Sequence, residues 1–341
     1  MITKLKLVNL CGGNAMNFDL NLGGLDEGKL IKLDESILYD VIIVGTGPAA
    51  ISAAVYCIRK GLKIAMIGTK IGGQVLDTNE IENIIGTVKT TGSEFAKRLE
   101  IHAKDYEIAL KEGSYVKLVE EEGKNKKVTT DDGKIYLGKT IIIATGAKWR
   151  ELNVPGEKEY KGKGVHYCAT CDGPFYRNLD VAIIGGGNSG VEAALDMSGI
   201  AKSVTIVEFM PELKADKILQ EKLYERKNIS VITNAQVTEI YGETFTTGLK
   251  YKNRANEEIE DLKIDGLFVE IGLVPNSDFV KGYVETTKFG EIIIDEINMT
   301  NVSGIFAAGD VTTTKFKQII IAMGEGAKAA LSAFDYLIKE Y

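Results

Sequence analysis

The sequence of 341 residues has room for about two domains, and its 45% hydrophobic and 26% charged residues are typical of a soluble globular protein. No apolar run approaches the roughly 18 residues that a membrane-spanning helix needs, so we expect no membrane partner. The formal net charge of -7, with acidic and basic residues interleaved, offers no basic stripe to a phosphate backbone, which argues against nucleic acid as a partner.

Residues 1–38 form an extension ahead of the first recognisable motif. Apolar and polar residues alternate from Asn17 to Gly24, which is compatible with a surface strand or hairpin. Cys11 does not fit a lipoprotein signal, because the apolar stretch before it is short and Leu10 is bulky where cleavage needs a small residue. We therefore expect a cytoplasmic chain, whose four cysteines do not build a disulfide scaffold.

The first motif is a strand, a glycine turn, an alanine-rich helix and a second strand between Tyr39 and Gly68. Gly45 permits the tight turn, Gly47 lets the backbone approach a dinucleotide pyrophosphate, and Ala50 takes the position where helix and strand pack closely. The second strand ends at Gly68, where an Asp or Glu would normally hold the adenosine ribose. The motif predicts a dinucleotide site whose ribose contact comes from elsewhere.

Cys168 and Cys171 stand three positions apart in the middle of the chain. A zinc site would need two more ligands, and the remaining cysteines and histidines contain no second close pair. A structural disulfide would close a ring of four residues, which restrains little of the unfolded chain. The spacing therefore favours redox chemistry, because a Cys-x-x-Cys turn at the start of a helix lowers the pKa of a thiol.

A second strand, glycine turn and helix follow between Leu179 and Phe209, with glycines at Gly185, Gly187 and Gly190. Here the acid is present, because Glu208 ends the second strand 23 residues after Gly185.

The charge around Glu208 favours NADH over NADPH, because the carboxylate accepts ribose hydroxyls and would repel a 2′-phosphate. Phe209, Met210 and Pro211 offer no guanidinium, and Lys214 is the only nearby cation that the sequence shows.

Near the C-terminus a short strand leads into Gly309 and Asp310, and a helix begins near Gln318. The positive end of such a helix would stabilise the negative charge that reduction places on a flavin ring. Two dinucleotide motifs, with a cysteine pair just before the second, indicate that electrons pass from a nicotinamide through a flavin to a disulfide.

These residues resemble the low-molecular-weight thioredoxin reductase family, and within it the flavoprotein core of the alkyl hydroperoxide reductase flavin subunits. The resemblance runs from about Tyr39 to Tyr341 and rests on the motifs GTGPAA, GGQVLDT, IEN, ATGAKWR, CATC, GGGNSG, VEFMPELKAD, FAAGD and KQI. It implies an α/β fold of the class II pyridine nucleotide-disulfide oxidoreductases, with two Rossmann-like dinucleotide-binding domains, the nicotinamide domain being inserted into the FAD domain.

By this resemblance the FAD-binding domain comprises residues 39–150 and 275–341, and the NAD(P)H-binding domain, residues 151–274, carries the redox-active cysteine pair. The chain is expected to cross between them near Lys148–Leu152 and Leu273–Asn276. The positions that match FAD contacts of the family are Gly45, Gly47, Pro48, Ala49, Gly73, Gln74, Thr78, Asn83, Thr145, Gly146, Gly309, Asp310, Lys317, Gln318 and Ile319. Those expected to bind NADH are Gly185, Gly187, Asn188, Ser189, Gly190 and Glu208.

The resemblance also implies the catalytic roles. Cys171 faces the flavin, Cys168 attacks the disulfide of the partner, and Asp172 is the acid that protonates a leaving thiolate or the flavin-linked sulfur. A helix cap is the alternative role of Asp172. His166 matches no residue that the family requires and is left out of the site, and Cys57 is expected to pack in the first helix.

We therefore expect a thioredoxin-disulfide reductase-like enzyme, a homodimer by resemblance. Hydride would pass from NADH to FAD, and two electrons would pass on to Cys171–Cys168 and a thioredoxin-like or glutaredoxin-like protein. Close relatives carry two thioredoxin-like domains ahead of the flavoprotein core, where this sequence has about 38 residues. The alternatives are electron delivery to a peroxiredoxin, oxygen as acceptor, a ferredoxin-fed flavoenzyme, or a non-catalytic flavin-binding sensor.

Overall fold

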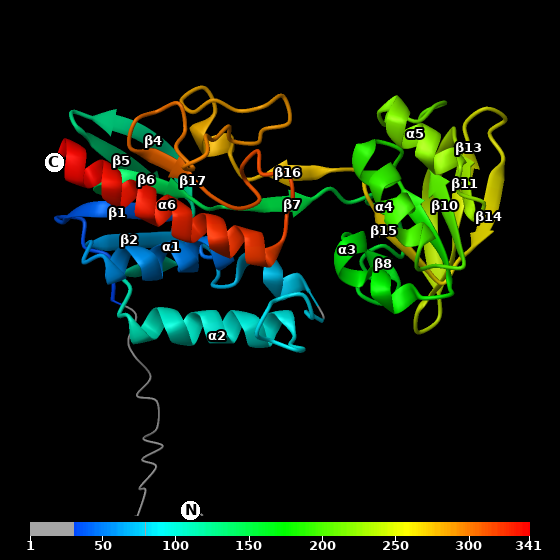
Figure 1. The fold of residues 1–341 in the computed structure, drawn as a ribbon, viewed down its shortest axis with the longest axis horizontal. Helices are drawn as coiled ribbons and strands as arrows, with labels where there is room; N and C mark the ends of the chain where they lie inside the picture. The colour runs from blue at the N-terminus through cyan, green and yellow to red at the C-terminus, as the bar shows by residue number, and fades with distance from the viewer. Residues whose placement is uncertain (1–30, 79) are drawn as a thin grey trace, which may run out of the picture.

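The computed structural model describes residues 31–78 and 80–341, and Figure 1 shows two lobes joined by a pair of strands. Cys11 and the strand or hairpin predicted for residues 17–24 lie outside the described residues. In the described part of the chain, no helix is both long and apolar enough to span a membrane.

A seven-stranded sheet is the centre of the first lobe. Its strands are β1 (Leu38–Val44), β2 (Ile64–Gly68), β3 (Leu110–Glu112), β4 (Val116–Glu122), β5 (Asn125–Thr130), β6 (Ile135–Ile143) and β17 (Ile305–Ala307). The order is β3-β2-β1-β6-β5-β4, and β17 pairs with β6. Because β1, β2, β6 and β17 are parallel, their carboxyl ends meet at one edge of the sheet.

Helices α1 (Pro48–Arg59) and α6 (Ile319–Glu340) pack together on one face of this sheet, and α2 (Gly92–Asp105) lies beyond α1 (Figure 1). Small residues permit the close contact, because a Cβ on Gly326 of α6 would lie 2.0 Å from the Ala49 carbonyl oxygen of α1. The Ser52 hydroxyl also donates to the Met323 carbonyl, at 2.7 Å. The start of α6 is thereby held beside the start of α1.

The second lobe repeats the first arrangement on a smaller scale. Its five-stranded parallel sheet has the order β11-β10-β9-β15-β8, and a three-stranded antiparallel sheet has the order β12-β13-β14. The elements are β8 (Val165–His166), α3 (Ala169–Asp172), the 3-10 turn η2 (Gly173–Tyr176), β9 (Asp180–Ile184), α4 (Asn188–Ser198), β10 (Ser203–Val207), α5 (Lys217–Tyr224), β11 (Ile229–Ile232), β12 (Ala235–Gly242), β13 (Thr246–Asn253), β14 (Ile259–Lys263) and β15 (Gly266–Val269).

Two neighbouring strands, β7 (Ala147–Trp149) and β16 (Leu273–Pro275), connect the lobes as an antiparallel pair. The ends of this pair are tied by reciprocal hydrogen bonds, in which the Thr145 hydroxyl donates to the Asn276 carbonyl at 2.7 Å and the Asn276 amide donates to the Thr145 carbonyl at 2.9 Å. Any turn of one lobe against the other must therefore bend at these two strands. The short 3-10 turns η1 (Gly73–Asp77) and η3 (Asp278–Val280) lie in the first lobe.

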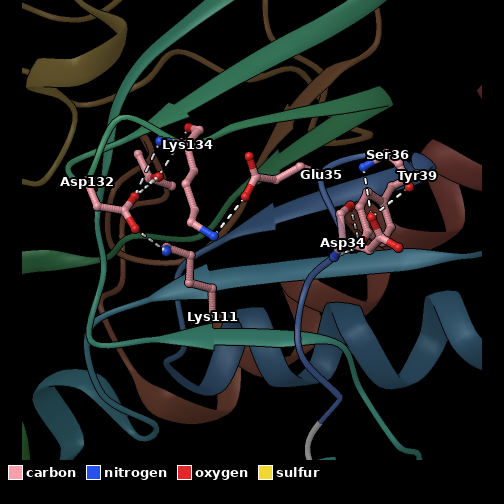
Figure 2. Close-up of polar contacts among 8 residues, drawn as sticks. Asp34, Glu35, Ser36, Tyr39, Lys111, Asp132 and Lys134 are labelled. Carbon is pink, nitrogen blue, oxygen red and sulfur yellow. Dashed lines mark hydrogen bonds and ion pairs between the residues drawn. The ribbon is translucent and has the colours of Figure 1, made fainter.

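The segment that leads into β1 is fastened to the first lobe by polar contacts (Figure 2). The Glu35 carboxylate lies 2.8 Å from the Lys134 ammonium, and the Asp34 carboxylate accepts from the backbone N–H of Ser36 at 2.9 Å. Lys111, on β3, pairs with Asp132 in the turn between β5 and β6, at 2.6 Å. These exposed contacts fix where the chain enters the sheet and lie away from the cysteine pair.

Candidate active site

A cleft of about 1900 Å³ is lined by residues of both lobes. The three predicted catalytic residues Cys168, Cys171 and Asp172 line it. So does every predicted FAD position, namely Gly45, Gly47, Pro48, Ala49, Gly73, Gln74, Thr78, Asn83, Thr145, Gly146, Gly309, Asp310, Lys317, Gln318 and Ile319. The fold thus brings together residues from widely separated parts of the sequence.

The first glycine turn has the shape of a phosphate cradle. Gly45 has a φ of +126°, and a Cβ there would lie 2.1 Å from the Ala144 carbonyl oxygen, so the fold itself requires this glycine. At Gly47 the nearest atom to an added Cβ is 4.0 Å away, so the protein has room for a side chain. That space lies at the N-terminus of α1, which has no side-chain cap. The turn therefore fits a pyrophosphate bound by backbone N–H groups.

The missing acid at the end of β2 has a steric reason. A Cβ on Gly68 would lie 2.6 Å from the Thr46 side chain, so a Glu or Asp does not fit this backbone. Thr69, Ser114 and Lys117 line the cleft near this point, and the Ser114 N–H donates to the Gly68 carbonyl at 3.3 Å. These polar residues supply the candidate ribose contacts that the sequence pattern did not identify.

The other end of the predicted FAD site is formed by the segment that precedes α6. Burial raises the pKa of the partly buried Asp310 carboxyl, against the opposing effect of the Lys317 charge. The Lys317 ammonium donates to the Thr312 carbonyl at 2.5 Å and lies 3.1 Å from a Glu291 carboxylate oxygen. Gln318 is the N-cap residue of α6, as the sequence predicted. A carboxyl, an ammonium and a helix N-terminus thus surround one part of the cleft.

The cysteine pair forms a disulfide at the start of the four-residue helix α3. Cys168 is the N-cap, and its sulfur accepts a hydrogen bond from the Cys171 N–H at 3.2 Å. The side-chain amide of Gln318, from the other lobe, lies 4.0 Å from the Cys168 sulfur. Both cysteines are partly exposed within the cleft, so the disulfide faces the predicted flavin site.

Asp172 is not a side-chain cap, because it makes no capping hydrogen bond at the start of η2. Its Oδ2 instead lies 3.1 Å from Nδ1 of His166, and Nε2 of that ring lies 2.7 Å from the Tyr176 hydroxyl. The sequence patterns left His166 out of the site. The structure brings it into direct contact with the predicted acid.

Glu270 is a second residue that sequence reasoning missed. It follows β15, and its carboxylate accepts a weak hydrogen bond from the Ala169 N–H of α3 at 3.4 Å. Burial raises the pKa of this carboxyl to about 7. A titratable group is therefore located beside the redox-active turn, although no motif pointed to it.

The second glycine turn repeats the geometry of the first. Gly185 has a φ of +118°, and a Cβ there would lie 2.5 Å from the Glu270 carbonyl oxygen. A Cβ on Gly190 would lie 2.0 Å from the Gly185 carbonyl oxygen, whereas nothing lies within 4 Å of one on Gly187. The turn thus has the open middle position that a nicotinamide pyrophosphate needs.

The predicted NADH residues Gly185, Gly187, Asn188, Ser189, Gly190 and Glu208 lie outside the lining of the large cleft. Asn188 and Asp216 hydrogen-bond each other, at 2.9 Å between their side chains and 2.8 Å from the Asp216 N–H. In this arrangement the disulfide lines the same cleft as the predicted FAD residues, whereas the predicted nicotinamide turn lies outside that cleft.

Glu208 is buried directly after β10 and accepts hydrogen bonds from the backbone N–H groups of Gly186, at 2.5 Å, and Met210, at 2.7 Å. Lys214 is paired with Glu212 at 2.6 Å. The prediction that Lys214 is the only nearby cation is wrong. Arg254, in the turn between β13 and β14, lies 3.9 Å from the Phe209 ring and donates to the Phe209 carbonyl at 2.8 Å.

Cys57 is fully buried in α1, and burial raises the pKa of its thiol to about 12. This environment suits a packed side chain and disfavours a reactive thiolate. Among residues 31–78 and 80–341, no three His, Cys, Asp or Glu side chains gather in a way that would hold a metal ion.

Comparison with known proteins identifies the family. The chain matches the pattern of the pyridine nucleotide-disulphide oxidoreductases over residues 39–326. It is 49% identical, over 320 residues, to the F subunit of the alkyl hydroperoxide reductase of Escherichia coli, a match that covers 93% of this chain and 61% of that protein. The chain thus spans about three fifths of the length of this curated relative.

Two solved thioredoxin reductases are also similar. The enzyme of Streptococcus pyogenes is 37% identical with a TM-score of 0.83, covering 89% of this chain and 99% of that one. The enzyme of Lactococcus lactis, in a state described as the FR conformation, is 38% identical with a TM-score of 0.61, covering 88% and 99%. The chain therefore belongs to the pyridine nucleotide-disulphide oxidoreductase family and has the Rossmann-like α/β fold of the thioredoxin reductases, as the sequence predicted.

Proposed function

We propose that the protein is a flavin-dependent disulfide reductase that transfers two electrons from NADH through FAD to the Cys168–Cys171 disulfide. A thioredoxin-like or glutaredoxin-like disulfide protein would then receive these electrons. The observation that carries the proposal is the cleft in which the disulfide and the predicted FAD residues face one another, with Gln318 contacting Cys168. The similarity to thioredoxin reductases, of which the chain covers 99% in one case, supports it.

The residues of the cleft fit FAD. The open position at Gly47 and the uncapped start of α1 would hold the pyrophosphate, and Asp310, Lys317 and Gln318 would surround the other end of the cofactor. Bound there, FAD would supply a group that accepts a hydride and passes on its two electrons. The protein would orient that group beside the disulfide and shield it from water.

The chain's own residues would perform the exchange with the partner. Cys168, at the N-cap of α3, is the proposed attacking sulfur, and Cys171 is the proposed sulfur that receives electrons from the flavin side. Asp172 would hold the proton that a departing sulfur needs. Its carboxyl group is one-fifth exposed and contacts His166, so it is available to both the cleft and the solvent.

The division of the chain into two domains is proposed from the family resemblance and agrees with the two lobes of Figure 1. We propose an FAD domain of residues 39–150 and 275–341 and a nicotinamide domain of residues 151–274. A disulfide that occupies the flavin side of the cleft would keep the nicotinamide away, so the second domain must turn about β7 and β16. The TM-scores of 0.83 and 0.61, obtained at 37% and 38% identity, support the view that lobes of this kind take more than one relative orientation.

NADH is the proposed hydride donor. Glu208 is located where ribose hydroxyls would be bound and is already held by two backbone N–H groups. Its buried charge would oppose a 2′-phosphate, whereas Arg254 would attract one. The Glu208 carboxylate lies directly after β10, whereas the Arg254 guanidinium contacts the ring and the carbonyl of Phe209, so we expect Glu208 to dominate. A homodimer is proposed from the family resemblance.

A peroxiredoxin is the second candidate partner, because a subunit of the alkyl hydroperoxide reductase of Escherichia coli is 49% identical to this chain. The test is NADH consumption by the purified flavoprotein, supplied either with a thioredoxin or with a peroxiredoxin and a hydroperoxide. Turnover with a disulfide protein that disappears in Cys168→Ser and Cys171→Ser, but persists in Cys57→Ser, supports the proposal. The proposal would be contradicted if both active-site variants still consumed NADH in response to the disulfide protein.

A further inference from the structure

His166 joins the predicted acid to a buried tyrosine. Its Nδ1 lies 3.1 Å from Asp172 Oδ2, and its Nε2 lies 2.7 Å from the Tyr176 hydroxyl. The three residues come from β8, α3 and η2, which the chain folds onto one another around the redox-active turn. The His166 side chain is 12% exposed, so the ring itself is largely shielded from water.

The two contacts fix the hydrogen positions on the ring. An ionised Asp172 can only accept hydrogen bonds, so Nδ1 of a neutral ring carries the hydrogen and donates it. Nε2 is then the acceptor, and the Tyr176 hydroxyl is the donor. Burial, followed by the charge of Asp172, raises the pKa of Tyr176, which keeps this hydroxyl protonated.

Packing holds the imidazole in this orientation. The Phe268 ring lies 5.5 Å from it, and the Tyr176 ring meets it edge-on at 5.3 Å. Two further titratable groups lie at the ends of β15. The charge of Asp265 helps to raise the pKa of Tyr176, and the Glu270 carboxylate accepts a hydrogen bond from the Ala169 N–H. Among the contacts of the described residues, the polar partners of the imidazole are therefore Asp172 and Tyr176.

We propose that His166 is a positioning residue, which holds the Asp172 carboxyl group in the orientation needed to give and take the proton of thiol–disulfide exchange. The inference rests on the proposed function, because it assigns Asp172 the role of the acid. His166 is not one of the predicted catalytic residues, but by this proposal efficient thiol–disulfide exchange depends on it.

Two protons accompany the two electrons that pass to the partner. In the reduced protein the Asp172 carboxylate first takes the proton of the Cys168 thiol. The Cys168 thiolate then attacks one sulfur of the partner disulfide, and the other partner sulfur leaves with that proton. The Asp172 carboxylate then takes the proton of the Cys171 thiol, whose sulfur attacks Cys168. The remaining partner sulfur leaves with that proton. The partner is now a dithiol, and the Cys168–Cys171 disulfide has formed again.

Three substitutions separate the contacts of the ring. In His166→Asn the side-chain amide is bonded to Cγ, as Nδ1 is, and would still donate to Asp172. In His166→Gln the amide reaches the place of Nε2 and would contact Tyr176 alone. His166→Phe keeps an aromatic ring at this position but loses the hydrogen bonds to both Asp172 and Tyr176. His102→Phe is the matched control, because His102 is exposed on α2 in the first lobe and packs beside Tyr106.

The assay measures exchange without NADH. The flavoprotein is reduced with dithiothreitol, freed of it, and mixed with hydroxyethyl disulfide, whose aliphatic thiolate leaves poorly unless it is protonated. We expect the rate to fall about tenfold in His166→Phe and His166→Gln, since a positioned acid contributes on the order of a hundredfold or more. It should stay within about twofold of wild type in His166→Asn and His102→Phe, which keep the contact to Asp172. With dithiobis-nitrobenzoate, whose thiolate leaves without a proton, the loss should be much smaller.

Two results would overturn the inference. One is an equal loss on both disulfides, or in His166→Asn as well, because that pattern indicates structural damage. The other is a further loss from His166→Phe in an Asp172→Asn background, since a residue that acts through Asp172 has no effect once the acid is gone. Flavin bleaching by NADH, measured separately on the oxidised wild type, tests the proposed function, so the two failures are distinguishable.

Discussion

The side-chain amide of Gln318 lies 4.0 Å from the sulfur of Cys168, although the two residues are 150 positions apart and belong to different lobes. Gln318 also accepts a hydrogen bond from the Asn83 amide, at 3.2 Å. One side chain thus connects the start of α6, the loop after η1 and the redox-active disulfide. This relationship places the cysteine pair at the predicted flavin site.

Gln318→Ala should slow electron transfer into the disulfide, because the amide stabilises the sulfur and holds the start of α6 in place. A hydrogen bond of this kind is worth about 1 kcal/mol, which corresponds to a rate change of roughly fivefold. Stopped-flow spectroscopy would follow the flavin after mixing with NADH. Asn83→Ala removes the contact between the loop and Gln318 but keeps the Gln318 amide beside Cys168, so it should have the smaller effect on electron transfer into the disulfide. Equal effects of the two substitutions would count against a role for the Cys168 contact.

Gly47→Ala should abolish FAD retention and leave the fold intact. The structure has room for the added methyl group, since the nearest atom would be 4.0 Å away, so the glycine serves a ligand. Gly187→Ala should instead raise the KM for NADH about tenfold or more, with FAD retained, because it fills the corresponding space in the second turn. Flavin content, thermal unfolding and steady-state kinetics provide the measurements.

The matched control for these variants is Gly61→Ala, at a position with open space away from both turns. It has a φ of +77°, so it should lower stability by about 1 kcal/mol and leave cofactor binding unchanged. A Gly47→Ala protein that keeps its flavin would show that the pyrophosphate is bound elsewhere.

Glu208→Ala should lower kcat/KM for NADH about tenfold and raise the preference for NADPH, since it removes the acceptor of the ribose hydroxyls and the charge that repels a phosphate. Arg254→Ala should then remove any gain for NADPH when combined with Glu208→Ala, because its guanidinium lies beside Phe209, whereas the nearby Lys214 is paired with Glu212. Initial rates with both nucleotides test the pair. A wild-type enzyme that prefers NADPH would refute the role of Glu208.

Glu270 should make the protein less stable as the pH rises. Its folded pKa is about 7, compared with 4.5 for the free side chain, so the folded state binds more protons between these values. The stability cost is absent below pH 4.5, grows up to pH 7 and is complete above it. Glu270→Gln, which retains an acceptor for the Ala169 N–H, should therefore stabilise the protein at about pH 8 by up to about 3 kcal/mol and leave it unchanged at about pH 4.5.

Denaturant unfolding at the two pH values measures this difference. The exposed Glu192 on α4 supplies the control, and Glu192→Gln should change stability little at either pH. If Glu270→Gln and Glu192→Gln change the free energy of unfolding equally at both pH values, burial does not destabilise the ionised Glu270 carboxylate.

The elements that carry the chemistry could be predicted from sequence because they are local. Gly45 and Gly185 mark turns whose backbone conformation only glycine adopts readily, and Cys168 and Cys171 define a helix start by their spacing. The helix predicted to begin near Gln318 begins at Ile319, directly after its N-cap residue Gln318.

The residues that sequence reasoning missed depend on tertiary contacts. His166 gains its importance only when α3 and η2 return Asp172 and Tyr176 to β8. Arg254 lies 45 positions from the Phe209 carbonyl that it contacts, and α5, β11, β12 and β13 come between them in the chain. No local sequence pattern predicts the contacts of His166 or of Arg254.

The most direct test of the proposed function is an anaerobic titration of the purified flavoprotein with NADH and, separately, with NADPH, while the flavin absorbance is recorded. We expect NADH to bleach the flavin at the lower concentration and about four electrons to enter per flavin, two for FAD and two for the disulfide. In Cys168→Ser the uptake should fall to about two, because the disulfide can no longer form. A wild-type flavin that takes up only two electrons, or that NADH does not bleach, would contradict the proposed path from NADH through FAD to Cys168–Cys171.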